Sequence, residues 1–167
     1  ITPQVEGLSL DEAFLDVTAS LKLFGRADEI ARQIKNSIKQ NIGITASVGV
    51  AHNKFLAKLA SDLQKPDGLV CVPANKVHQF LDPMPIGRLW GIGPRTAPKL
   101  KAQGILTFGQ LRQADQAVLR TALGNRAEHF RLLAAGKDER EVISSSGEKS
   151  ISHEITFDQD LTRRSEM

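Results

Sequence analysis

The sequence has few of the features that mark secreted, disulfide-rich or membrane proteins. A single cysteine, Cys71, excludes a disulfide within the chain. There is no signal peptide and no long uncharged apolar run. The four histidines, at positions 52, 78, 129 and 153, are scattered without the spacing of metal ligands. We therefore expect a soluble protein of a reducing compartment with no membrane partner, and a buried packing thiol at Cys71 in the strand-like run GLVCVP.

Positive charge is concentrated in the middle of the chain. Residues 1–72 hold eight Lys/Arg and eight Asp/Glu, so they balance. Residues 73–137 hold ten Lys/Arg and three acids, a net charge of +7. Such an excess on folded sequence favours a polyanionic partner, because neutralising phosphates releases counterions. A solvated helical surface explains the same charge equally well.

Residues 1–72 alternate between strand and helix patterns. Helix 27–40 is predicted by three isoleucines at four-residue spacing and an acidic first turn. Asn53 is a candidate N-cap for a second helix, and the run 44–51 reads as a central strand. The predicted strands are 4–9, 13–18, 44–51 and the run LVCV. This order predicts an α+β fold with a mixed sheet and helices on one face.

The pattern changes at Pro73, after which residues up to Ala135 read only as short helices and turns. Residues 138–149 are polar and Ser-rich, which is typical of a linker. Strand character returns in 150–167 but stops too soon to close a sheet. We therefore expect two small domains, a tether and the start of a third domain, as in a piece of a longer protein.

Two adjacent acids, Asp11 and Glu12, interrupt the strand-like run GLSLDEAFLDVT. Neighbouring residues of a strand face opposite sides, so both carboxylates reach one cation only at a strand end or tight hairpin. Carboxylates of this kind are ligands for Mg²⁺ in phosphoryl transfer. A hairpin turn with solvated acids is the simpler interpretation of the pair alone.

The stretch GIGPRTAPKLKAQGI, residues 91–105, reads as a helix–hairpin–helix. Glycines let the backbone come close to a ligand, Pro94 stands at a first helical position, and free N–H groups at a helix start suit phosphate. Arg95, Lys99 and Lys101 add charge beside it. We favour phosphate binding over an unrelated helical turn with glycine caps. Trp90, just before the hairpin, is expected to pack between the two domains.

Four motifs in this order resemble the Y-family translesion DNA polymerases, and most closely their bacterial DinB branch. The motifs are SLDEAFLDVT, ASVGVAHNKFLAKLASDLQKPDG, LWGIGPRTAPKLKAQGI and KSISHEITFDQD. The resemblance implies a palm fragment for 1–72, an all-helical thumb for 73–137, a linker for 138–149 and the start of the little finger for 150–167.

The resemblance also implies roles for particular residues. Asp11 and Glu12 would be the catalytic ligands of two Mg²⁺ ions, and Lys65 would contact the triphosphate of the incoming nucleotide. The DNA backbone would lie on the hairpin and its flank, that is, on Gly91, Ile92, Gly93, Arg95, Lys99 and Lys101. Ser9 would shape the acidic turn. Lys65 alone, at a helix end, needs no explanation beyond the helix dipole.

The implied activity is DNA-directed DNA synthesis on a primer 3′-hydroxyl, with primer–template DNA and a deoxynucleoside triphosphate as partners. A sliding clamp, a monomeric state and a bacterial cytoplasmic location at the nucleoid are further expectations. The resemblance implies that the family's other metal-binding Asp and its fingers, with a Tyr/Arg pair for the triphosphate, lie before residue 1. In agreement, the chain has no tyrosine. We therefore expect residues 1–167 alone to be inactive.

Two other functions are compatible with parts of this pattern. A non-catalytic DNA-binding module would keep the hairpin and carry a degenerate palm, although Asp11 and Glu12 are both present. A nucleotide cyclase-like enzyme would share the palm fold, because fold does not fix function. The hairpin and the basic segment argue against a cyclase, which needs no grip on DNA.

Overall fold

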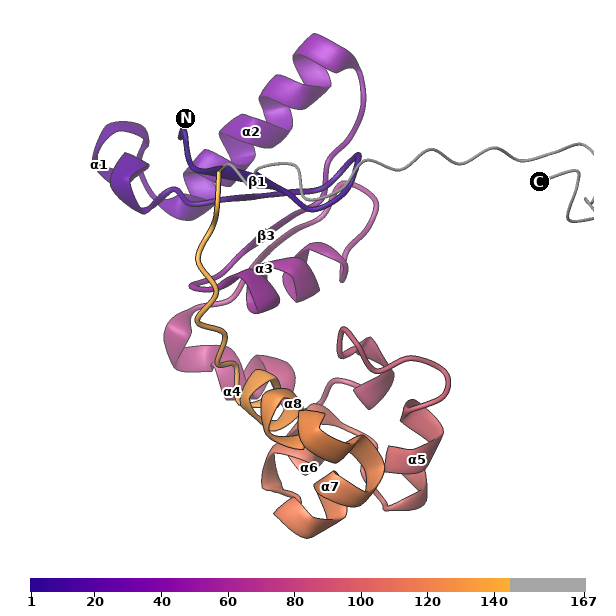
Figure 1. Cartoon of the computed structure of the whole chain (residues 1–167). Helices are drawn as coiled ribbons and strands as arrows, with labels where there is room; N and C mark the ends of the chain where they lie inside the picture. The colour runs from indigo at the N-terminus through magenta and orange to yellow at the C-terminus, as the bar shows by residue number, and fades with distance from the viewer. Residues whose placement is uncertain (145–167) are drawn as a thin grey trace, which may run out of the picture.

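The computed structural model describes residues 1–144 and opens with an antiparallel β-hairpin (Figure 1). Strand β1 (Val5–Gly7) pairs with β2 (Ala13–Leu15), and Glu6 lies opposite Phe14. Because side chains alternate along a strand, Glu6 and Phe14 share one face of the hairpin. That face is turned toward helix α3. The predicted strands 4–9 and 13–18 are both present, but they are shorter than expected.

A short helical turn follows and leads into the longest helix of the described chain. Helix η1 (Thr18–Ser20) and α1 (Leu21–Phe24) precede α2 (Ala27–Ile42), as the isoleucine spacing predicts. The start of α2 is fixed where the backbone N–H of Arg26 donates to the Glu29 carboxylate at 2.7 Å. The helix ends at Gly43, whose φ of 78° suits a residue without a side chain.

A parallel strand pair and the helix between its strands form the second part of the α+β region. Strands β3 (Val48–Val50) and β4 (Leu69–Cys71) are joined by α3 (Lys54–Ser61). The predicted N-cap is confirmed, because Asn53 accepts a hydrogen bond from the Leu56 backbone at 3.0 Å. The four strands within residues 1–144 form two separate pairs, one antiparallel and one parallel.

Two expectations for this region are corrected. The predicted central strand 44–51 is reduced to the three residues of β3, because the residues before Val48 do not pair with another strand. The Cys71 thiol is exposed rather than buried. Cys71 is the last residue of β4 and half-buried Val70 precedes it, so alternation turns the thiol away from the side that packs.

The regular structure of residues 74–134 is helical, as predicted, apart from one isolated antiparallel β-bridge between Pro85 and Thr107. The elements are η2 (Ala74–Lys76), α4 (Val77–Leu81), η3 (Ile86–Arg88), α5 (Ala97–Ala102), α6 (Phe108–Gln113), α7 (Gln116–Leu123), η4 (Gly124–Arg126) and α8 (Ala127–Ala134). One boundary differs from the prediction. Helix α5 begins at Ala97, and Pro94 lies in the turn before it, where the N–H groups of Thr96 and Ala97 both donate to the Gly93 carbonyl at 3.0 Å.

The two regions share one hydrophobic core through α3. Phe55, Leu56 and Leu59 of α3 belong to the same buried cluster as the apolar residues of the helical region. The rings of Phe55 and Phe108 stack with their centroids 6.3 Å apart. Helix α3 therefore packs on β3 with one side and on the helical region with another.

After α8 the chain runs back to the α+β region, and residues 137–143 are here called the return segment (Figure 1). The Asp138 carboxylate accepts from the Phe55 backbone N–H at 2.9 Å, in the first turn of α3. The Lys54 ammonium donates to the Glu141 carbonyl at 3.1 Å, and the Ile143 N–H donates to the Glu6 carboxylate at 2.7 Å. The return segment is thus fastened to both α3 and β1.

Alanine at Asp138 is expected to destabilise the chain by about 2 kcal/mol, because the Phe55 N–H then lacks an acceptor at a helix start. The Asp138 side chain is only 4% exposed, so water replaces it poorly. For a chain of this size the loss corresponds to roughly 4–8 °C in Tm, measurable by circular dichroism. Glu139→Ala is the matched control, since Glu139 is exposed. Equal melting temperatures for the two variants would show that Asp138 does not cap α3.

The α+β fold class is confirmed, with strands and helices followed by a helical region. The expected mixed sheet is corrected, because the strands of residues 1–144 form one antiparallel and one parallel pair that are not joined by hydrogen bonds. The expectations for residues 145–167, the later part of the linker and the start of a third domain, lie outside the described residues. Among residues 1–144, no helix is both long and apolar enough to cross a bilayer.

Candidate functional site

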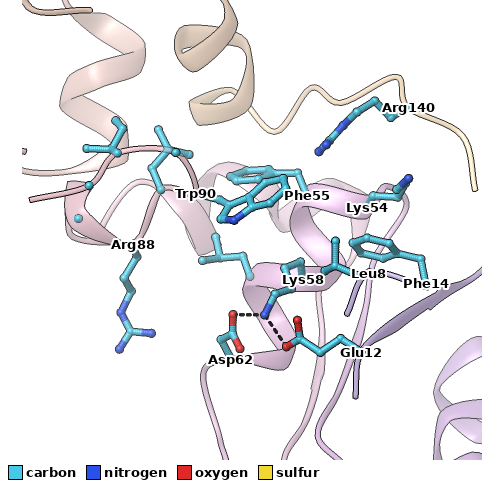
Figure 2. A pocket seen from close by; sticks show the side chains of 16 residues that line it. Leu8, Glu12, Phe14, Lys54, Phe55, Lys58, Asp62, Arg88, Trp90 and Arg140 are labelled. Atoms are coloured by element: carbon cyan, nitrogen blue, oxygen red, sulfur yellow. Dashed lines mark hydrogen bonds and ion pairs between the residues drawn. The ribbon is translucent and has the colours of Figure 1, made fainter. Parts of the chain in front are cut away.

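A cleft of about 680 Å³ lies where the β-hairpin, α3 and the loop before α5 meet (Figure 2). Its floor is apolar, with Phe55 and Leu59 from α3 and Phe14 from β2. Its rim carries ionic side chains of both signs. The residues that line it are Leu8, Glu12, Phe14, Lys54, Phe55, Lys58, Leu59, Asp62, Gly87, Arg88, Leu89, Trp90, Gly91, Ile92, Gly93 and Arg140.

The two acids predicted as metal ligands lie in the loop of the β-hairpin. The loop is closed by hydrogen bonds from the Leu8 and Ser9 N–H groups to the Glu12 carbonyl, at 2.8 and 3.2 Å. The Ser9 hydroxyl donates to the Asp11 carboxylate at 2.7 Å, so Ser9 shapes the turn as the resemblance implied. Glu12 lines the cleft, whereas exposed Asp11 lies at the tip of the loop outside the lining.

Glu12 belongs to a network of four charged groups. The Lys58 ammonium donates to Glu12 Oε1 at 2.9 Å and to Asp62 Oδ2 at 2.7 Å (Figure 2). Lys65 pairs with the other Asp62 oxygen at 2.7 Å and lies 3.6 Å from Glu12 Oε1. The structure thus brings predicted Glu12 and Lys65 together through two residues that the sequence reasoning missed, Lys58 and Asp62. Their i, i+4 spacing on the α3 pattern was a signal for an ion pair, though not for its position beside Glu12.

The network stabilises the charged forms of Lys58, Asp62 and Lys65. Partial burial opposes the charge of Lys58, but its hydrogen bonds to Asp62 and Glu12 raise the pKa of the ammonium above its ordinary value. Partial burial likewise opposes the charge of Asp62, and the hydrogen bonds from Lys58 and Lys65 hold the pKa of that carboxyl below its usual range. The hydrogen bond to Asp62 raises the pKa of Lys65.

The glycine loop before α5 forms the opposite wall of the cleft. Gly91 has a φ of 92°, and a side chain there would press on the Phe130 ring, with a Cβ 3.2 Å from its nearest carbon. Ile92 is buried, which fixes the loop on the helical core, and Gly93 is exposed. These three predicted residues line the cleft together with Glu12.

The predicted basic flank lies outside the cleft. Arg95, Lys99 and Lys101 are exposed on and before α5 and do not line the cavity. Trp90 lines the cleft between α3 and the glycine loop, but its side chain stays 59% exposed rather than packed. The Arg140 guanidinium lies 5.8 Å from the centre of the Trp90 ring, which ties the return segment to this wall.

The donor set at the loop suits a hard divalent cation. Magnesium is held through one or two carboxylates, with substrate phosphates and water completing its shell. Within residues 1–144, no three His, Cys, Asp or Glu side chains gather closely enough to hold a metal by themselves. Asp11 and Glu12 would therefore supply only part of such a ligand set.

Two family models match the chain over the regions just described. The impB/mucB/samB family matches residues 1–62, and the IMS family HHH motif matches residues 74–105. A DNA polymerase IV from Desulfatibacillum aliphaticivorans is 49% identical over 160 residues, which are 96% of this chain and 40% of the relative. One from Alkalilimnicola ehrlichii is 44% identical over 99% of this chain and 47% of the relative.

Solved structures agree in fold. The crystal structure of DinB from Sulfolobus solfataricus has a TM-score of 0.76 and 36% identity, covering 83% of this chain and 41% of that one. An insertion ternary complex of Dbh DNA polymerase has a TM-score of 0.76 at 35% identity and the same coverage.

A region of strands and helices that matches one family model, followed by a helix–hairpin–helix that matches the other, is thus an arrangement typical of DNA polymerases of this fold. The chain belongs to the DinB-type branch of the Y-family DNA polymerases, which confirms the resemblance drawn from its motifs. It spans less than half the length of the curated relatives cited above.

Proposed function

We propose that the full-length protein is a translesion DNA polymerase and that the cleft is part of its active site. The observation that carries the proposal is the position of Glu12, which lines one cavity with Lys58 and the glycine loop of the helix–hairpin–helix and lies 3.6 Å from the Lys65 ammonium. A carboxylate, cations for a triphosphate and a backbone loop for DNA are the parts that template-directed nucleotidyl transfer requires. The proposed domains are palm 1–72, thumb 73–137, linker 138–149 and little finger from 150.

Asp11 and Glu12 would hold the two Mg²⁺ ions of the complete active site. When bound, the ions would activate the primer 3′-hydroxyl and stabilise the charge of the transferring phosphoryl group. This chain's own contribution is the closed loop, in which the Ser9 hydroxyl orients Asp11 and the Lys58 ammonium orients Glu12. Further ligands would come from outside the described residues and from the substrate, so residues 1–167 alone would not extend a primer.

Lys65 would bind the triphosphate of the incoming nucleotide. Its side chain is 53% exposed at the rim of the acidic network, and Asp62 holds its ammonium beside Glu12. A flexible, exposed ammonium suits a phosphate that arrives and leaves in each cycle.

We propose a sliding clamp as a further partner, a monomeric state and a location in the cytoplasm at the nucleoid.

The glycine loop and the basic flank would grip the DNA backbone without reading bases. A tight loop of exposed backbone beside Arg95, Lys99 and Lys101 suits phosphate, and contacts with phosphate position DNA without reading its sequence. The Dbh ternary complex is a polymerase structure similar in fold, and the +7 segment of this chain contains the residues that match the IMS family HHH motif. The grip is therefore proposed to be independent of sequence.

Replacing Arg95, Lys99 and Lys101 with alanine is expected to weaken binding of the 167-residue chain to primed DNA for every sequence tested. Each lost phosphate contact lowers the slope of log affinity against log salt by about 1, so the triple variant loses up to about 3. Fluorescence anisotropy over a salt series measures the slope. Lys22→Ala with Lys39→Ala is the control, because both lysines are exposed but lie on the palm.

An unchanged salt slope in the triple variant would contradict the proposed DNA grip. The same anisotropy series distinguishes the alternative of a non-catalytic module when it is paired with primer extension by the full-length protein. Binding through the hairpin without any extension would favour that module.

A further inference from the structure

Two lysines one turn apart on α3 contact the β-hairpin in different ways. Lys54 is buried and donates to both oxygens of Glu6 at 2.6 Å, with the Phe14 ring 5.0 Å from its ammonium. Lys58 lies four residues later on the same face and reaches Glu12. The ion pair of Lys54 with Glu6, together with the return segment that is hydrogen-bonded to both residues, already holds the hairpin on α3. The Lys58 contact is therefore not needed to dock the hairpin.

Lys58 is held at Glu12 from behind. Asp62, one turn further along α3, accepts from Lys58 through Oδ2 and from Lys65 through Oδ1, so each lysine has its own oxygen. The Lys58 side chain is 23% exposed, against 53% for Lys65. The Lys58 ammonium lies 2.9 Å from Glu12 Oε1, and the Lys65 ammonium lies 3.6 Å from it. Glu12 thus carries a resident cation supplied by the protein.

We propose that Lys58 is a positioning residue that sets the divalent-cation affinity of Glu12 by occupying its Oε1 as an internal competitor. The inference rests on the proposed function of Glu12 as a metal ligand. A cation that binds Glu12 must share the carboxylate with an ammonium 2.9 Å from Oε1, which uses one lone pair and repels a second positive charge. The free protein therefore binds the cation weakly.

The resident ammonium also protects the hairpin when no cation is bound. An acidic loop tip with two adjacent carboxylates is self-repelling, and Lys58 neutralises the member that faces the cleft. Among residues 1–144, the Asp11 carboxylate at the tip accepts from the Ser9 hydroxyl, forms no ion pair and is exposed to water. The two acids are thus unequal before any metal binds.

Manganese binding to the 167-residue chain tests this inference, measured by the relaxation of water protons. Lys58→Met keeps the length of the side chain but removes the competitor, so Mn²⁺ affinity should rise roughly tenfold, as unscreened charges at this distance interact strongly. Lys58→Arg keeps the competing cation, and its affinity should stay within about twofold of the wild type. Lys39→Met removes an exposed charge on α2 and should leave affinity unchanged.

Two arms separate this inference from the proposed function. Glu12→Gln should abolish most Mn²⁺ binding; if it does not, Glu12 is no ligand and both ideas fail. If Glu12→Gln loses binding but Lys58→Met binds Mn²⁺ equally or more weakly, only the competitor role is overturned. Absence of Mn²⁺ binding in both the wild type and Lys58→Met also overturns it. Circular dichroism melts of each variant show that the fold is retained.

Discussion

Alanine at Asp11 or at Glu12 is expected to reduce primer extension by the full-length protein about a thousandfold while DNA binding stays close to the wild type. A metal ion supplies several kcal/mol of transition-state stabilisation, and each ~1.4 kcal/mol is a factor of ten in rate. Both side chains lie in the hairpin loop, and neither belongs to the buried core, so the loss should appear in the rate rather than in folding. Single-turnover extension of a primed template with Mg²⁺ measures it.

The control for this experiment is Asp16→Asn, in the same sequence motif. Asp16 accepts from the Thr18 backbone N–H at 2.8 Å beyond the end of β2 and does not line the cleft. Its replacement should leave extension within a few-fold of the wild type. Wild-type rates in both alanine variants would return Asp11 and Glu12 to the role of turn residues and remove the basis of the proposed active site.

Gly49→Ala is expected to destabilise the fold by 3 kcal/mol or more, beyond the ~1–3 kcal/mol that overpacking usually causes. Gly49 is the middle residue of β3, where α3 packs on the strand. A Cβ there would lie 2.0 Å from the Ala57 carbonyl oxygen and 2.5 Å from the Ser61 nitrogen. Both are backbone atoms of α3, so no side chain can move aside, and the helix must shift away from the strand.

Gly7→Ala provides the comparison for Gly49, because Gly7 also lies in a strand and has open space where its Cβ would be. Its melting temperature should stay within a few degrees of the wild type, whereas Gly49→Ala should melt more than about 6 °C lower. Similar melting of the two variants would show that α3 and β3 are not packed as closely as the structure has them.

Local patterns in the sequence predict much of this fold. Isoleucine spacing predicts α2, Asn53 predicts the start of α3, and the punctuation after Pro73 predicts the short helices, because each depends on neighbours within one or two turns. Strand lengths and the face of Cys71 were less predictable. The strands have three residues each, too few for alternation to define a face.

The sequence indicated individual residues of the candidate site but not the contacts between them. Glu12 and Lys58 are 46 residues apart, and Lys54 and Glu6 are 48 apart, so no local pattern joins them. Asp11 and Glu12 were identified as a pair, yet Glu12 lines the cleft whereas Asp11 lies at the tip of the hairpin. The basic flank of α5 was expected beside the glycine loop and lies there, but outside the cavity.

The return segment has a mechanical consequence. Because Asp138 and Glu141 are bonded to α3, and Ile143 to Glu6 on β1, tension applied between the two ends of residues 1–144 would not run through the helices between 74 and 134. It would load the contact between Ile143 and Glu6 first. The helical region therefore lies outside the path of the force, and it is not stretched until the hydrogen bonds of the return segment break.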